Sequence, residues 1–298
     1  MNNLKSILAI AFSLITWASA FTVIKVVVDQ HQFAVVHLVF WRLIFAAIFL
    51  FIVGIIYGIK IPKLKDFPLI LATAICGIVF YNLALCYAEI QISSGAASFI
   101  GATSPIWCVM IAILFLKDKI NFGILVGIII SILGIYIISI FENASGKLEL
   151  TMNKYTVLMI AAAVGSGAYT VFHKLLLKKY TPLESNVYIW CGGAILILFF
   201  WKGAGEALIQ APKTIILSIL YLSIVPAALA YWAWSYALSK LSIVTATSTV
   251  YLIPVITIII SLIFINEPIK IMMIVGGIIA VFGVAILNIS KLKAVKKE

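Results

Sequence analysis

The stretch NFGILVGIIISILGIYIISIF at residues 121–141 decides the fold class, and IKIMMIVGGIIAVFGVAILNI at residues 269–289 has the same character. Each is about 20 residues long and mostly apolar, which is the length that a helix needs to cross the hydrocarbon core of a bilayer. A helix is required rather than a strand because every backbone N–H and C=O group in lipid needs a partner, which a helix finds within its own segment. Both stretches are therefore predicted to be transmembrane helices.

Apolar runs of the same kind fill nearly the whole chain of 298 residues. Hydrophobic residues make up 64% of the chain and charged residues 10%, whereas a soluble domain carries roughly 25% charged residues. The sequence therefore predicts an all-α integral membrane protein with ten transmembrane helices. The runs cover residues 5–28, 34–58, 67–88, 94–116, 121–141, 154–173, 183–201, 212–237, 243–265 and 269–289.

The positions of the lysines predict the orientation of these helices. Lysine and arginine accumulate in cytoplasmic loops, so the lysine-rich set of loops places both termini in the cytoplasm and requires an even number of spans. We expect a multi-pass protein of the inner (plasma) membrane. The net charge of +11 lies mostly in short loops, so it predicts topology and no nucleic-acid partner. The lysine-rich set holds Lys5, Lys60, Lys63, Lys65, Lys117, Lys119, Lys174, Lys178, Lys179, Lys240, Lys291, Lys293, Lys296 and Lys297, and the opposite set holds Lys147, Lys154, Lys202, Lys213 and Lys270.

An internal repeat becomes visible when the chain is displaced by 149 residues. The displacement pairs Pro105 with Pro254, Gly127 with Gly276, Gly134 with Gly283, Tyr87 with Tyr236, and Ser93 with Ser242. Each unit holds five predicted helices, an odd number, so the second copy enters the membrane in the opposite orientation. We predict two inverted five-helix repeats, at residues 1–146 and 147–298. Inverted repeats are typical of transporters, whose substrate site lies near the bilayer midplane between the halves.

Several short motifs, in order along nearly the whole chain, resemble those of the drug/metabolite transporter superfamily, EamA-like family. Residues 17–21 (WASAF) followed by Lys25 resemble the first-helix motif of the family, and Arg42 resembles its second-helix arginine. Pro254 with residues 266–268 (NEP) resembles the signature between its ninth and tenth helices. The resemblance implies ten helices, a central cavity lined mainly by spans 1, 3, 4, 6, 8 and 9, and export of amino acids and related metabolites.

Arg42 is the candidate binding residue with the highest energetic cost. It lies about eight residues into the second span, roughly 12 Å from its end at the rise of a helix. A charge at such a depth costs about 2.5–3.5 kcal/mol or more when it is unpaired. Arg42 therefore either pairs with a helix end or an acid such as Glu89 or Asp29, or contacts a substrate carboxylate. Lys25, near the end of the first span, is expected to extend toward the headgroups.

Polar and aromatic side chains at helical spacing supply the other candidates. Such stripes face either the cavity or a neighbouring helix. The aromatic residues of segment 231–236 would suit an apolar or aromatic side chain or an organic cation. Pro105, Pro226 and Pro254 lie within spans, where proline favours a kink, and they are candidate gating positions. The candidate cavity residues are Trp17, Arg42, Tyr81, Asn82, Ser98, Trp107, Ser166, Tyr169, His173, Tyr231, Trp234, Thr245, Ser248 and Tyr251.

The chain contains no phosphate-binding loop, no metal-ligand cluster and no Ser or Cys beside a His, so we expect no enzyme activity, no metal and no cofactor. Asp and Glu residues fall near the ends of spans, so a buried carboxylate proton relay is not expected. The predicted function is secondary active or facilitative transport of small polar metabolites, amino acids or related compounds, in the direction of export and by alternating access. The alternative is a membrane-embedded enzyme or a scaffold without transport activity. The expected partners are the lipid bilayer and a small-molecule substrate, with the protein as a monomer or homodimer.

Overall fold

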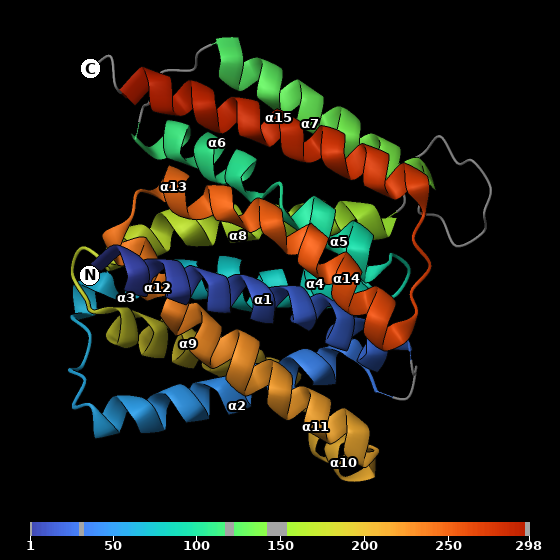
Figure 1. Cartoon of the computed structure of the whole chain (residues 1–298). Coiled ribbons are helices and arrows are strands. Elements are labelled where there is room, and N and C mark those ends of the chain that lie inside the picture. Colours follow the sequence, from blue (N-terminus) through green and yellow to red (C-terminus); the bar gives the residue numbers. More distant parts are fainter. Residues whose placement is uncertain (1, 30–32, 117–121, 142–153, 296–298) are drawn as a thin grey trace.

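The computed structural model of the chain describes residues 2–29, 33–116, 122–141 and 154–295, and within these ranges it contains helices and no strand. Nine helical segments there are long and apolar enough to cross a membrane, and Ile271–Leu287 is a shorter apolar helix. The predicted all-α membrane fold is confirmed (Figure 1). The count of ten spans and the inverted orientation of the second half stay predictions.

Six helices run without interruption through most of their span. They are α1 (Asn2–Asp29), α2 (Val35–Ile56), α7 (Phe122–Phe141), α8 (Lys154–Leu176), α9 (Pro182–Ile197) and α15 (Ile271–Val295). Three short elements lie at the ends of spans: η1 (Leu64–Asp66), η3 (Leu198–Phe200) and α10 (Ala204–Gln210). The capping chemistry at α9 explains its sharp start, because the Thr181 side chain accepts from the Glu184 N–H while the Glu184 carboxylate accepts from Thr181.

Four spans are interrupted, and the interruptions recur at the displacement of 149 residues. One span consists of α3 (Phe67–Ala74), the π-helical segment η2 (Ile75–Phe80) and α4 (Tyr81–Ala88). Its counterpart consists of α11 (Lys213–Leu222), the π-helical segment η4 (Ser223–Leu229) and α12 (Ala230–Lys240). Another span divides into α5 (Ser94–Gly101) and α6 (Ser104–Leu116), and its counterpart into α13 (Ile243–Ser248), the 3₁₀ segment η5 (Thr249–Leu252) and α14 (Ile253–Ile265).

The three prolines lie at these interruptions. Pro226 is inside η4, where its missing N–H removes one helical hydrogen bond. Pro105 and Pro254 are each the second residue after a break, at the start of α6 and α14. In η2 the equivalent of Pro226 is Gly77, and a Cβ built there would lie 2.3 Å from the Tyr169 ring. The same π-helical interruption thus contains a proline in one half and, in the other half, a glycine in close contact with a neighbouring helix. A gating role of the prolines stays a prediction.

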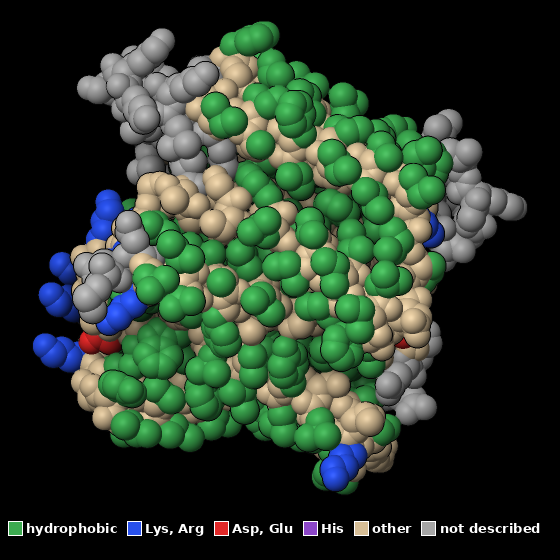
Figure 2. Space-filling model, in the orientation of Figure 1, with side chains coloured by type: hydrophobic (Ala, Val, Ile, Leu, Met, Phe, Trp, Pro, Cys, Tyr) green, Lys and Arg blue, Asp and Glu red, His purple; other side chains and the backbone are tan. Residues whose placement is uncertain are grey.

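The surface divides into a broad apolar belt and two ends. Figure 2 shows hydrophobic side chains over most of the visible face and lysines gathered at one end. We call this the basic end, defined by Lys60, Lys63, Lys65, Lys178 and Lys179, all of them exposed. The span Leu64–Ala88 begins there, since Lys179 is paired with Asp66. The same span finishes at the opposite end of the molecule, which we call the Glu89 end.

Helices α7 and α15 pack together more closely than any other pair, because glycine faces glycine (Figure 1). A Cβ built on Gly134 would lie 2.3 Å from the backbone nitrogen of Ala280 and 2.5 Å from the carbonyl oxygen of Gly276. Between the glycines, the Ser131 hydroxyl donates to the Ala280 carbonyl at 2.9 Å. Small residues let helix backbones approach where lipid provides no hydrophobic driving force between helices. These faces therefore join the two halves within one chain.

We expect Gly134→Ala to destabilise the fold, because the added methyl group meets backbone atoms that cannot rotate away. Overpacking of this kind costs about 1–3 kcal/mol. The free energy of unfolding in detergent, measured by denaturant titration, should fall by that amount. Gly205→Ala is the matched control, since a Cβ there meets nothing within 4 Å. Equal stability of the two variants would contradict the close α7–α15 contact.

Candidate functional site

A cavity lies where equivalent segments of the two halves meet. Its volume, as the space open to the centres of water molecules, is about 70 Å³, which is room for about five waters. The cavity is thus of the size of one small metabolite. It is lined by Trp17, Ala20, Phe21, Arg42, Tyr81, Leu85, Ser98, Gly101, Ala102, Ser104, Ser166, Tyr169, Thr170, Tyr231, Trp234, Thr247, Val250 and Ile253.

Most of this lining is duplicated. Seven pairs of lining residues are related by the displacement of 149 residues: Trp17 and Ser166, Ala20 and Tyr169, Phe21 and Thr170, Leu85 and Trp234, Ser98 and Thr247, Gly101 and Val250, and Ser104 and Ile253. The remaining four break the pattern, and Arg42 is the charged residue among them. The cavity is thus built from equivalent positions of the two halves that carry different side chains, and the unmatched Arg42 adds a charged group to one side of it.

Arg42 on α2 is buried, with 2% of its surface exposed. Its Nε and Nη1 atoms have no hydrogen-bond partner. The ion pairs found in the described residues are Lys25 with Asp29 and Lys179 with Asp66, so neither acid considered for Arg42 forms an ion pair with it. A buried donor without a partner is costly. The unused N–H groups of Arg42 can therefore bind an anionic group in the cavity, such as a carboxylate.

Aromatic rings form the wall that runs from α1 to α12 and α8. The Trp17 ring lies 5.2 Å from the Tyr231 ring and 5.2 Å from the Trp234 ring, between centroids. Tyr169 on α8 lies 5.5 Å from Tyr231. The Trp17 indole N–H donates to the carbonyl oxygen of Pro226 at 3.0 Å, so the π-helical segment η4 fixes the orientation of this ring. The wall therefore presents mainly apolar ring faces to a ligand.

The structure brings eight of the predicted residues to the cavity and leaves six outside. The lining includes Trp17, Arg42, Tyr81, Ser98, Ser166, Tyr169, Tyr231 and Trp234. The residues outside it are Asn82, Trp107, His173, Thr245, Ser248 and Tyr251.

The six residues outside the cavity contact other parts of the protein. The Asn82 amide donates to the Ile78 carbonyl at 2.6 Å, and His173 Nε2 lies 3.1 Å from the Ser185 hydroxyl. Trp107 contacts α8 at Gly167. The other three belong to the segment that contains α13 and η5: Thr245 is exposed at the start of α13, Ser248 is half-buried, and Tyr251 packs against the cluster of Ile106, Val109 and Ile124.

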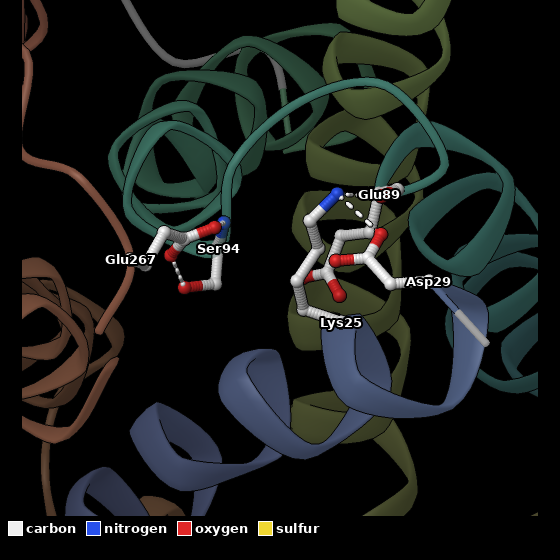
Figure 3. Close-up of polar contacts among 5 residues, drawn as sticks. All are labelled: Lys25, Asp29, Glu89, Ser94 and Glu267. Carbon is white, nitrogen blue, oxygen red and sulfur yellow. Dashed lines mark hydrogen bonds and ion pairs between the residues drawn. The ribbon is translucent and has the colours of Figure 1, made fainter. Parts of the chain in front are cut away.

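Polar contacts connect α1, the end of α4, the start of α5 and the connection between α14 and α15 at the Glu89 end (Figure 3). The expectation that Lys25 extends toward the headgroups is wrong: its side chain is 14% exposed and its ammonium group donates to the backbone carbonyl of Glu89 at 2.9 Å. The same ammonium group forms an ion pair with Asp29 at 2.9 Å. Beside it, the Glu267 carboxylate accepts from both the backbone N–H and the hydroxyl of Ser94, at the first residue of α5.

A chain of buried hydroxyls connects these contacts to α1 and α14. The Ser94 hydroxyl lies 2.6 Å from the Ser261 hydroxyl, which lies 2.7 Å from the Thr22 hydroxyl. At the other end of the molecule, the Lys174 ammonium group donates to the carbonyls of Leu238 and Leu241. Each end of the molecule thus has a lysine that donates to the end of a facing helix, and we call these two contacts the lysine closures.

Sequence reasoning missed two kinds of residue. Applying the displacement of 149 residues to the predicted Ser98 and Trp234 would have identified Thr247 and Leu85 as lining residues. Glu89 was expected to lie near a span end without deep burial, whereas the structure leaves none of its surface exposed. No local signal reveals this, because a position at the end of an apolar run does not show which neighbouring helices will cover it.

Membrane-crossing helices thus surround a cavity that contains a buried arginine without an ion pair, an arrangement that suits a membrane transporter. The chain belongs to the EamA-like transporter family, whose family model matches it twice, at residues 4–140 and 153–289. The two matches are displaced by the same 149 residues that relate the cavity pairs.

Named relatives are transporters. A "Probable terminal-alkyne amino-acid exporter" of Streptantibioticus cattleyicolor is 30% identical, over 95% of this chain and 93% of the relative. The "Uncharacterized transporter YdfC" of Bacillus subtilis is 31% identical, over 90% of this chain and 86% of the relative. A solved crystal structure with 13% sequence identity has a TM-score of 0.61 and covers 97% of this chain and 99% of that chain, which shows a shared fold.

We expect Ser94→Ala to lower stability, because the Glu267 carboxylate loses the Ser94 hydroxyl as a donor and the buried Ser261 hydroxyl loses it as an acceptor. The loss of such buried partners costs about 1–3 kcal/mol. The free energy of unfolding in detergent is the measurement. Ser239→Ala, which removes one hydrogen bond from a half-buried serine to the Tyr236 carbonyl, is the control and should lose less. A Ser94→Ala variant as stable as the control would argue against the hydroxyl chain.

Proposed function

We propose that this protein is a secondary active or facilitative transporter that exports small amino-acid-like metabolites by alternating access. The observation that carries the proposal is the buried Arg42 guanidinium, which faces the cavity with two N–H-bearing nitrogens unpartnered. A guanidinium group binds carboxylates with strong, charge-assisted hydrogen bonds. The cargo class is therefore a compound with one carboxylate.

The rest of the cargo is recognised by the aromatic wall. Trp17, Tyr231 and Trp234 present ring faces and edges within the same cavity as Arg42. Rings of this kind contact apolar side chains over a large area and also attract cations. An α-amino acid with an apolar or aromatic side chain satisfies both sides of the cavity. The printed name of the Streptantibioticus relative, an amino-acid exporter, supports this class.

The duplicated architecture supports alternating access. Equivalent residues of the two halves line the cavity, and equivalent lysines, Lys25 and Lys174, form the two lysine closures. We propose that the halves have opposite orientations in the membrane and that the two closures open in turn. The lysine-rich basic end is placed in the cytoplasm with both termini, so the Glu89 end faces outward.

Transport by purified protein in liposomes tests the proposal, with radiolabelled L-phenylalanine and L-leucine as the first probes. In the Arg42→Gln variant the apparent affinity should fall roughly 10- to 100-fold, because a hydrogen bond to a charged group contributes about 1.5–3 kcal/mol. Arg42→Lys should retain part of the affinity. Lys213→Gln, at an exposed lysine, is the matched control and should behave as the unmodified protein.

A second comparison isolates the carboxylate. L-Phenylalaninamide has the same ring and amino group but no carboxylate, so it should compete poorly with L-phenylalanine in the unmodified protein. In Arg42→Gln the two compounds should compete about equally. Equal competition already in the unmodified protein, or equal transport by Arg42→Gln and Lys213→Gln, would exclude a carboxylate contact at Arg42.

A further inference from the structure

The two lysine closures are the same contact made twice. Lys25 and Lys174 are related by the displacement of 149 residues, and so are the carbonyl groups they bind, those of Glu89 and Leu238. The two contacts lie at opposite ends of the molecule. Lys25 binds where the span Leu64–Ala88 finishes, whereas Lys174 lies one helical turn before Lys178 at the basic end, where that span begins.

The side chains at these equivalent positions differ in chemistry. Leu238 is apolar, but Glu89 carries a carboxyl group that is fully buried. Neither of its oxygens has a hydrogen-bond partner. Glu89 is also the C-cap of α4, where the helix dipole places partial negative charge and opposes a carboxylate. A buried, unsolvated carboxylate at this place is unfavourable, while a neutral carboxylic acid is compatible with it.

Charged groups of both signs face Glu89 from the surrounding elements. Burial, the largest effect, raises the pKa of the Glu89 carboxyl well above its usual range. The positive charges of Lys25 and Arg42 lower this pKa in part, and the negative charges of Glu267 and Asp29 raise it further. Two acids and two bases thus offset each other in part, and burial decides the direction. From α8, which packs against α4, the charged group at this end is Lys154, whose ammonium group lies 5.0 Å from the Tyr155 ring. The titratable side chains of α4 itself are Tyr81, Cys86 and the exposed Tyr87.

Glu89 is connected to the cavity through its own helix. Tyr81 and Leu85 line the cavity, and Glu89 continues the same helical face one turn beyond Leu85. Arg42 is a cavity residue that also acts electrostatically on Glu89. The carboxyl therefore lies between the cavity and the Lys25 closure, where any opening of the Glu89 end would admit water to it.

We propose that Glu89 is a proton-binding site whose occupancy is required for the Glu89 end to close. In the closed state the carboxyl is neutral and buried under Lys25. When this end opens, water solvates the carboxyl and the proton is released to that side of the membrane. The equivalent closure at Lys174 has Leu238 in this position, so it carries no such proton. Acid on the side facing the Glu89 end then favours closure of that end, and alkali favours its opening.

Infrared spectroscopy of the purified protein tests the protonation directly and needs no substrate. The unmodified protein should show the C=O band of a buried carboxylic acid at neutral pH, and this band should decline at alkaline pH. Glu89→Gln should lack the band. Glu206→Gln, at an exposed glutamate on α10, should retain it. A spectrum in which Glu89→Gln keeps the band, or in which the unmodified protein has none at neutral pH, would overturn the proposal.

Cys86 reports the closure itself, because it is fully buried on α4 three residues before Glu89. With Cys86 kept as the single cysteine, its rate of modification by N-ethylmaleimide should rise more steeply with pH in the unmodified protein than in Glu89→Gln. Glu206→Gln should follow the unmodified protein. Identical pH profiles for Glu89→Gln and Glu206→Gln would overturn the proposal.

A second variant, Glu89→Leu, keeps the proposal testable if Glu89→Gln does not fold. Glu89→Leu places the side chain of the equivalent position 238 at the Glu89 end, and it should protect Cys86 at every pH. Neither measurement uses cargo, so the proton site is tested separately from the transport of amino acids. A protein that moves no amino acid can still show the infrared band of protonated Glu89. A protein that transports amino acids but lacks this band would disprove the proton site alone.

Discussion

A lysine ammonium group that donates to the last carbonyls of a facing helix is the interaction on which the rest of this structure depends. The last four carbonyls of any helix lack partners within the helix, and in lipid no water replaces them. Lys25 supplies a donor to the end of α4, and Lys174 supplies one to the end of α12. Each contact ties the first helix of one half to the third span of the same half, and the two contacts lie at opposite ends of the molecule.

The interrupted helices follow from the same constraint. Backbone groups that leave the regular ladder need partners, and the structure supplies them from the cavity wall. The carbonyl of Pro226 in η4 accepts from the Trp17 indole, while Gly77 in η2 leaves room for the Tyr169 ring. The π-helical segments thus position two of the aromatic rings that line the cavity. Under the proposed alternating access, small helical rearrangements at these segments would reposition the rings and so transmit a change at one closure to the cargo.

Two charged residues, Arg42 and Glu89, make the two halves of the protein unequal. The cavity is lined from equivalent positions of the two halves, whereas Arg42 and Glu89 have no charged counterpart at Cys191 and Leu238. In our proposals the cation contacts the cargo and the acid binds a proton. Both lie toward the Glu89 end of α2 and α4, so the binding of cargo and of the proton can influence each other over a short distance.

Sequence alone predicts the fold well, because run length, lysine placement and the displacement of 149 residues are global properties of a chain in a bilayer. It predicts cavity residues well on regular helices, as for Ser166 and Tyr169 on α8. It does not show which face of a divided span looks toward the cavity. Ser98 on α5 lines the cavity, whereas Trp107 on α6 contacts α8. On α13, Thr247 lines the cavity, whereas Thr245 is exposed and Ser248 is half-buried outside it.

The inverted relation of the two halves can be measured most directly at Gln91 and Lys240, which are exposed and related by the displacement of 149 residues. Single cysteines at these positions, in otherwise cysteine-free protein, are treated in intact cells with a maleimide that does not cross membranes. The account predicts that Gln91→Cys reacts from outside and that Lys240→Cys reacts only after the cells are opened. Reaction of both cysteines from the same side would contradict it.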